Sequence, residues 1–266
     1  MSNRFTSNPA DWPPPLSVFP VSRAEIVVEN GPHPFHIAEE AEAAANWQAE
    51  IALNPALYDG RMVLQRDVHI RDGVIRSRTH VVPYSTFLWW RKKRGEGAFH
   101  LHGWPVIVSS DDALIAIRMG AHTANPGKVY FPAGSLEEED IAGGFCDLDG
   151  NMAREVMEET GLDLKTAVSG DGLHALHARR VVCAFRLFRF AATANELIAR
   201  IREHIRNDPD PEIDDAVAIR NADPADHDYP DLMPPILDWF FDTPIRGVDT
   251  AGSCRSNRGS ADCRWK

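Results

Sequence analysis

The spacing of hydrophobic and polar residues predicts a short strand, a long helix and three extended segments in the first hundred residues. Residues 24–30 alternate as in a strand, whereas 36–53 carries apolar side chains at helical spacing and ends at Asn54-Pro55. The extended segments, rich in β-branched or aromatic residues, are 61–70, 73–82 and 84–93. Asp72-Gly73 predicts a hairpin turn between the first two.

A second series of strands and helices follows from residue 101. It begins with two strands joined at Asp111-Asp112, and continues with a long strand at 177–192 and an amphipathic helix at 194–206. A strand at 215–221 and a short apolar helix at 233–242 complete it. We expect an α/β protein with an N-terminal helix-and-strand extension, a main domain and a tail without apolar periodicity that is disordered, over 1–100, 101–246 and 247–266.

Charge and composition exclude several classes of partner. The 266 residues are 44% hydrophobic, enough for a sizeable core, and carry a formal net charge of -11. This balance argues against duplex nucleic acid or an anionic membrane as partner, so a polyanionic substrate would need a local cation. Four cysteines without a CxxC pair, together with the lack of a signal-peptide core or a membrane-spanning run, predict a cytoplasmic protein with free thiols.

Three glutamates gather on one face of a predicted helix at 152–160. Glu155, Glu158 and Glu159 stand three and four residues apart, where like charges repel, so helix stability does not explain them. Converging carboxylates are hard oxygen ligands of the kind that Mg²⁺ or Mn²⁺ prefers, and the cation would remove the repulsion. Arg154 can pair with one of these carboxylates and fix its orientation.

Glycines flank this helix on both sides. Gly161 can adopt the left-handed conformation that ends a helix. Gly134 lies in "FPAG", a loop whose backbone can approach a ligand closely and whose carbonyl could reach the metal. Together, Gly134 and residues 154–162 resemble the Nudix box, G-x5-E-x7-R-E-U-x-E-E-x-G-U, in which U is an aliphatic residue.

The Nudix resemblance covers roughly residues 101–245 and carries expectations for fold and chemistry. It implies an α/β/α sandwich with a mixed sheet that hydrolyses nucleoside-diphosphate-linked compounds with a divalent metal. It also implies that Glu155, Glu158 and Glu159 bind the metal and that Arg154 orients a carboxylate. Water would attack a phosphorus of the diphosphate, and a carboxylate would deprotonate or position that water.

The spacing inside the box departs from the family pattern. Nineteen residues separate Gly134 from Arg154, six more than in the family. The first glutamate of the family pattern falls on Asp140 when counted from Gly134, and on Cys146, beside Asp147, when counted from Arg154. We hypothesise that the inserted loop folds beside the metal site and that Asp140 or Asp147 replaces this glutamate; the alternative is a surface bulge. Besides these two aspartates and the helix glutamates, the open candidates for the missing carboxylate or the general base are Glu137, Glu138, Glu139, Glu212 and Asp214.

Cations, histidines and tryptophans outside the box are weaker candidates, namely Arg118, His122, Lys128, His100, His102, Trp89 and Trp90. The loop cations could bind substrate phosphate, although such side chains are more often only solvated. The alternating histidine pair lacks a third ligand and predicts a structural role. At least one of the neighbouring tryptophans is expected in the core, while the other could stack on a base.

These observations predict a hydrolase that cleaves the diphosphate linkage of a nucleoside-diphosphate derivative, with Mg²⁺ or Mn²⁺ as cofactor and a small molecule as partner. Two alternatives stay open: a catalytically silent Nudix-like module that senses a nucleotide, and, among enzymes, a UDP-sugar hydrolase. The stretches "NPALYDGRMVL" and "STFLWWR" weakly resemble UDP-glucose-cleaving members, whereas the intact glutamates argue against the silent module. A homodimer is left open.

Overall fold

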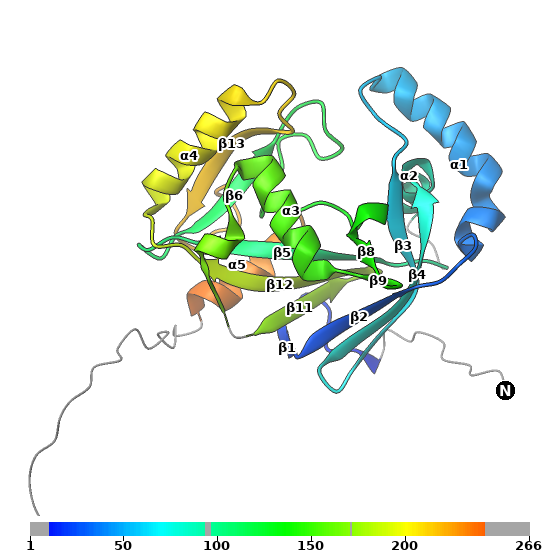
Figure 1. Ribbon diagram of the computed structural model, residues 1–266, viewed down its shortest axis with the longest axis horizontal. Helices are drawn as coiled ribbons and strands as arrows, with labels where there is room; N and C mark the ends of the chain where they lie inside the picture. Colours follow the sequence, from blue (N-terminus) through cyan, green and yellow to red (C-terminus); the bar gives the residue numbers. More distant parts are fainter. Residues whose placement is uncertain (1–10, 94–96, 171, 243–266) are drawn as a thin grey trace, which may run out of the picture.

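The computed structural model describes residues 11–93, 97–170 and 172–242. Two mixed sheets and five α-helices build this part of the chain, which confirms the predicted α/β class (Figure 1). The expected tail from residue 247, with Cys254 and Cys263, lies outside the described residues.

The larger sheet has eight strands, of which only β12 and β5 pair in parallel. Its main path runs β1 (Phe19–Val21), β11 (Leu173–Ala178), β12 (Val181–Arg189), β5 (His100–Val108), β6 (Leu114–Met119) and β13 (Ile213–Ile219), with β10 (Val168–Ser169) beside β12 and β7 (Val129–Tyr130) beside β6. β1, from the N-terminal part of the chain, therefore completes one edge of a sheet whose other strands come from the predicted main domain.

The smaller sheet has five strands, and again one pair, β2 with β4, is parallel. Its order is β3 (Arg61–Arg71), β4 (Val74–Pro83), β2 (Arg23–Val28), β9 (Phe145–Cys146) and β8 (Ile141–Ala142). The predicted hairpin between β3 and β4 is confirmed, and its turn residue Asp72 has a φ of 52°. The short strands β8 and β9 come from the inserted loop and pair with β2 of the N-terminal part.

The helices are α1 (Pro34–Leu53), α2 (Tyr84–Lys93), α3 (Leu148–Thr160), α4 (Ala194–Asn207) and α5 (Met233–Asp242), with short 3-10 turns at η2 (Glu138–Asp140) and η3 (Leu164–Thr166). α3 packs on β5 and on α4, and α4 also packs on β6 and β13. α5 packs on the larger sheet through Trp239, whose ring lies 5.3 Å from that of Phe185 in β12. The predicted helices at 36–53, 194–206 and 233–242 are confirmed.

Two predicted strands were wrong. Residues 84–93 form the helix α2, because Asp59 Oδ1 accepts a hydrogen bond from the Ser85 backbone at 2.7 Å and Phe87 and Trp90 pack into a small apolar cluster with α1 and β3. Residues 177–192 are not one strand but the end of β11, a turn and β12, with Arg179 at a φ of 54°. Burial of aromatic side chains overrode strand propensity in the first case.

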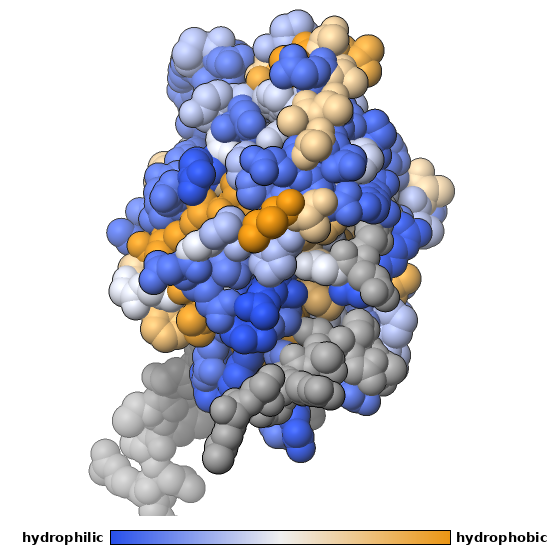
Figure 2. Space-filling view, turned by 90° about the vertical axis from the view of Figure 1, so that its right-hand side faces the viewer, coloured by the Kyte–Doolittle hydropathy of each residue, from blue (hydrophilic) through white to orange (hydrophobic). Residues whose placement is uncertain are grey.

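The face on the side of α1 is mostly hydrophilic, with apolar residues in small groups (Figure 2). Ile37 on α1 and Leu53 and Tyr58 near its end are among the exposed large hydrophobic side chains. Among the described residues, no helix combines the length and the apolar character needed to span a bilayer.

Candidate active site

Both ends of α3 are fixed by local interactions that the sequence encodes. Asp147 caps the start, where its carboxylate accepts a hydrogen bond from the Gly150 backbone at 2.9 Å. Gly161 ends the helix in the left-handed region, with a φ of 68°, as predicted. The apolar residues Met152 and Val156 are fully buried, so the apolar face of α3 packs on the core.

The loop at Gly134 passes directly over the first glutamate of α3. A Cβ atom placed on Gly134 would lie 2.2 Å from Oε1 and 2.4 Å from Oε2 of Glu155, closer than any side chain tolerates. A side chain at this position would force the Glu155 carboxylate to move, so glycine lets the loop backbone lie directly against it. Glu155 is 8% exposed and therefore lies between α3 and this loop.

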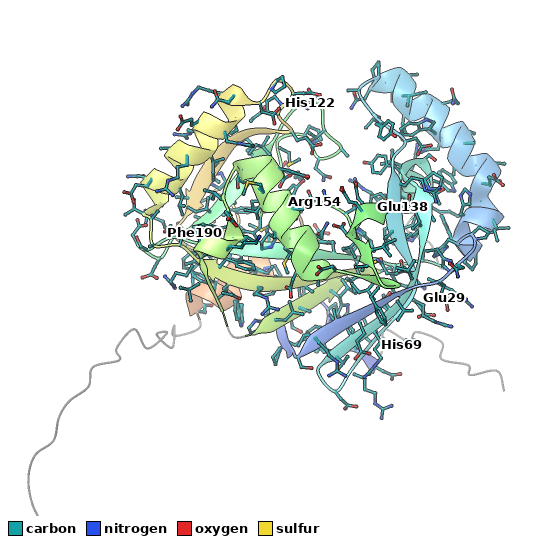
Figure 3. The ribbon with its side chains drawn as sticks, viewed as in Figure 1. Glu29, His69, His122, Glu138, Arg154 and Phe190 are labelled. Atoms are coloured by element: carbon teal, nitrogen blue, oxygen red, sulfur yellow. The ribbon has the colours of Figure 1, made fainter. Side chains whose placement is uncertain are left out.

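Arg154 joins the carboxylates of α3 to those of the inserted segment. Its guanidinium lies 2.7 Å from Glu155 Oε1, 2.9 Å from Glu158 Oε2, 3.2 Å from Asp140 Oδ2 and 3.5 Å from Glu139 Oε1. Figure 3 shows Arg154 on α3 beside the segment that carries Glu138. The predicted pairing of this arginine with a helix carboxylate is present. Because four carboxylates already surround the Arg154 guanidinium, its positive charge is offset by these partners and does not attract a substrate anion.

The two aspartates of the inserted loop have different surroundings. Asp140 is 7% exposed and accepts hydrogen bonds from the Glu137 backbone at 2.8 Å, from Asn151 Nδ2 at 2.9 Å and from Arg154. Asp147 instead caps α3. Between them, residues 141–146 form the β8–β9 hairpin that extends the smaller sheet. Of the two positions, only Asp140 contacts Arg154 in the described structure.

A cavity of about 200 Å³ lies beside the acidic face of α3. Carboxylates line it from α3, from the end of α4 and from the segment before β13, and they belong to Glu155, Glu158, Glu159, Asp208, Asp210 and Glu212. His204 of α4 lines the same cavity, and its Nε2 lies 2.8 Å from the Glu158 carbonyl oxygen. All three predicted helix glutamates therefore face one space, and Glu212 joins them, whereas Asp214 is exposed and does not line the cavity.

Two of these carboxyls are costly to ionise. Burial raises the pKa of Glu155 to about 8, although Arg154 acts in the opposite direction. Burial also raises the pKa of Glu159 well above its usual range, and the charges of Glu155 and Glu212 add to the effect. Oε2 of Glu159 is buried without a hydrogen-bond partner among the described residues. A cation between these groups would favour their ionised forms and supply the missing partner.

The side chains do not by themselves form a complete metal site. Within residues 11–93, 97–170 and 172–242, no group of three His, Cys, Asp or Glu side chains is arranged to hold an ion. Glu155 and Glu158 both contact Arg154, at 2.7 and 2.9 Å, but Glu158 is exposed, so the buried carboxylate oxygens belong to Glu155 and Glu159. The donor chemistry, two buried carboxylates beside a backbone loop, still suits a hard divalent cation.

No family model and no curated protein matches the sequence. Solved structures do match, and three of them cover 54% of this chain. One is a Nudix hydrolase. This structure, RenU from M. smegmatis, is 9% identical over 83% of its length with a TM-score of 0.34. The MutT protein from Methanosarcina mazei Go1 is 16% identical over 94% of its length with a TM-score of 0.36, and the E. coli ORF135 protein is 13% identical over 91% with a TM-score of 0.34.

The weaker sequence candidates have structural surroundings. His102 is buried, and its ring lies 4.9 Å from that of His100 and 5.5 Å from that of Trp104, in line with the predicted structural role. Trp90 is buried at 2% exposure, whereas Trp89 is half-buried and donates to Glu39 at 3.0 Å. The expectation that at least one tryptophan packs in the core is confirmed.

The predicted phosphate-binding cations are spread out. Lys128 pairs with Asp228 at 2.6 Å. The loop that holds His122 is tied to the end of α1, because Asn54 Nδ2 donates to the His122 carbonyl at 2.7 Å (Figure 3). Arg118 lies on β6, where its charge acts on Asp215 of β13.

Sequence reasoning missed two polar residues of this region. Asn151, one turn before Glu155 on α3, donates through Nδ2 to Asp140 at 2.9 Å and to the Ser135 carbonyl at 3.3 Å, and it is fully buried. Arg91 of α2 was not recognised as a candidate, because residues 84–93 were predicted to form a strand. The signal available for Asn151 was its spacing, four residues before Glu155 and therefore on the same face of the helix.

Proposed function

We propose that this chain is a divalent-metal-dependent hydrolase that cleaves the diphosphate linkage of a nucleoside-diphosphate derivative. The observation that carries the proposal is the pair of buried carboxylates, Glu155 and Glu159, beside the Gly134 loop at an acid-lined cavity. Two buried carboxyls with raised pKa values and an unpartnered oxygen are an expensive arrangement without a cation.

Mg²⁺ or Mn²⁺ fits these donors. Glu155, Glu158 and Glu159, with the carbonyl of Gly134, would hold the ion. When bound, the ion supplies positive charge to the phosphate oxygens and makes water a better nucleophile. Arg154 keeps Glu155 and Glu158 oriented through its contacts of 2.7 and 2.9 Å, and it acts as a positioning residue.

The remaining steps belong to the residues of the chain. We assign Glu212 as the general base, because it lines the cavity and its charge acts on Glu159. The oxygen of water forms a bond to one phosphorus, and the bond from this phosphorus to the bridging oxygen breaks. The proton of water passes to Glu212, and the bridging oxygen leaves on the second phosphate. Asp140 takes part only by holding Arg154.

Hydrolysis of a substrate panel in ¹⁸O-labelled water tests this proposal. The panel holds ADP-ribose, dinucleoside polyphosphates, nucleoside triphosphates and UDP-sugars, each with Mg²⁺, with Mn²⁺ and with a chelator. We expect metal-dependent cleavage of at least one member, with the label in a phosphate product. Cleavage that persists in the chelator would contradict the metal dependence, and label only in the sugar would contradict water attack on phosphorus.

Matched variants decide which residues carry the activity. Glu159→Gln should lower turnover by about a hundredfold or more and weaken Mn²⁺ binding, because it removes a buried ligand. Glu203→Gln on the exposed side of α4 removes the same charge and should change neither. Tight binding of a nucleotide without any cleavage would instead favour the silent sensing module. Selective cleavage of UDP-sugars would establish the narrower activity.

A further inference from the structure

The acidic cavity leaves open which positive group receives the anionic substrate. Arg154 contacts four carboxylates, and Lys128 pairs with Asp228 at 2.6 Å. A polyanion approaching a wall of glutamates and aspartates meets repulsion unless a cation faces it. Such a cation must lie near the glutamates and carry no carboxylate partner of its own.

Arg91 of α2 meets both conditions. Within the described residues it has no ion pair to a carboxylate, and its guanidinium donates to a neutral acceptor, Asn125 Oδ1, at 2.9 Å. The guanidinium has five donors and stays charged, so at least two N–H groups and the full charge are available. Its carbon lies 5.9 Å from the ring centre of Phe87, which holds the stem against α2.

Tyr130 connects Arg91 to the glutamates. Asn125, which accepts from Arg91, donates through Nδ2 to the Tyr130 hydroxyl at 3.3 Å. Gly120, at the start of the same loop as Asn125, donates a backbone hydrogen bond to the Glu212 carbonyl oxygen at 2.8 Å. Arg91 is therefore linked through the loop that precedes β7 to Tyr130 and to Glu212, a residue that lines the acidic cavity.

We propose that Arg91 binds a phosphate group of the substrate, so that the N-terminal part of the chain completes the site. The inference rests on the proposed function, since it assigns the phosphate contact of the same reaction. A planar fork of N–H donors matches two oxygens of one phosphate, and the charge offsets the repulsion from the carboxylates. Arg91 is a binding residue here, while the glutamates hold the metal.

Binding of analogues that cannot be hydrolysed separates this role from catalysis. The probes are ADP and UDP analogues with a methylene group in place of the bridging oxygen, titrated calorimetrically in Mg²⁺. Arg91→Gln should weaken their binding by about tenfold to a hundredfold, the range for a hydrogen bond to a charged group. For a substrate that the wild type cleaves, KM should rise by a similar factor while kcat changes by less than about threefold.

Lys92→Gln is the matched control. It removes one positive charge at the next position of α2, but Lys92 points to α1, where it donates to Asn46 at 2.8 Å and pairs with Glu50 at 3.6 Å. Its analogue binding should equal that of the wild type. If both variants bind the analogues equally weakly, the loss of one positive charge anywhere on α2 explains the effect, and the assignment of Arg91 is overturned.

The remaining outcomes separate the two proposals. If the wild type binds and cleaves while Arg91→Gln does both equally well, the role of Arg91 is refuted and the hydrolase stands. If the wild type neither binds the analogues nor cleaves any panel member, both are refuted. Should Arg91→Gln melt at a much lower temperature, Arg91→Lys decides: partial weakening at an unchanged melting temperature supports the fork, and wild-type affinity for the phosphate overturns it.

Discussion

Gly134→Ala is the sharpest test of the site, because its effect follows from a single close approach. The added methyl would lie 2.2 Å from Glu155 Oε1, whereas ordinary contact begins at 3.4 Å, so the carboxylate must retreat by about 1 Å. Gly134 does not have a positive φ, so the backbone itself accepts alanine. Alanine also keeps the carbonyl, so the substitution tests the place of Glu155 and not the loss of a backbone ligand.

The expected magnitudes follow from that displacement. Overpacking should lower the free energy of unfolding by about 1 to 3 kcal/mol, and moving one ligand by about 1 Å should lower kcat by roughly a hundredfold. Chemical unfolding and steady-state kinetics measure the two effects, and manganese titration should show weaker binding. Gly170→Ala is the control, since its methyl would meet Leu187 only at 3.5 Å. Wild-type kcat in Gly134→Ala, or an equal loss in Gly170→Ala, would refute the reasoning.

Two further predictions concern neighbouring carboxyls. Without metal, the raised pKa of Glu155 makes the folded state hold a proton that the unfolded state has released between pH 4.5 and about 8. This stability is fully present below pH 4.5 and lost as pH rises through about 8, by up to about 5 kcal/mol. Glu155→Gln should reduce that slope in unfolding curves recorded with a chelator, and Glu159, whose pKa is also raised, should leave a residual slope of the same sign. Asp140→Asn should lower turnover by about a hundredfold by releasing Arg154, whereas Asp147→Asn should keep wild-type rates because asparagine caps a helix equally well. If both variants turn over substrate at the same rate, Asp140 has no role in positioning Arg154, and the inserted segment only connects Gly134 to α3.

The acidic helix could be predicted from sequence because its information is local. Glu155, Glu158 and Glu159 share a face at three- and four-residue spacing, and Gly161 marks the end of the helix. Residue type also marked Gly134 as a position where the backbone can approach another group closely, although the group it meets in the structure, Glu155, was not predicted. Periodicity and glycine are signals that need no knowledge of distant contacts.

The errors arose where distant contacts decide. In α2, the aromatic residues suggested a strand, but Phe87 and Trp90 are buried by contacts with α1 and β3. Helix α1 lies more than thirty residues earlier in the sequence, and the β3–β4 hairpin separates β3 from α2. The turn at Arg179 carries no glycine, asparagine or aspartate, so no local residue announced it. The inserted loop forms the β8–β9 hairpin because β9 pairs with the edge of β2. The sequence of the loop alone does not reveal this pairing.

The position of α2 bears on why an acidic protein would handle an anionic substrate at all. Six carboxylates line the cavity, and the arginine among them is already neutralised by its own partners. On the proposed function, the metal ion would offset part of this negative charge at the reacting phosphate, and Arg91 would offset a further part from α2. Because Asp59 and the packing against α1 fix the position of α2, the N-terminal residues are needed to hold the Arg91 guanidinium in place. A chain cut at residue 100 would keep the glutamates and lose the group that we assign to hold the substrate beside them.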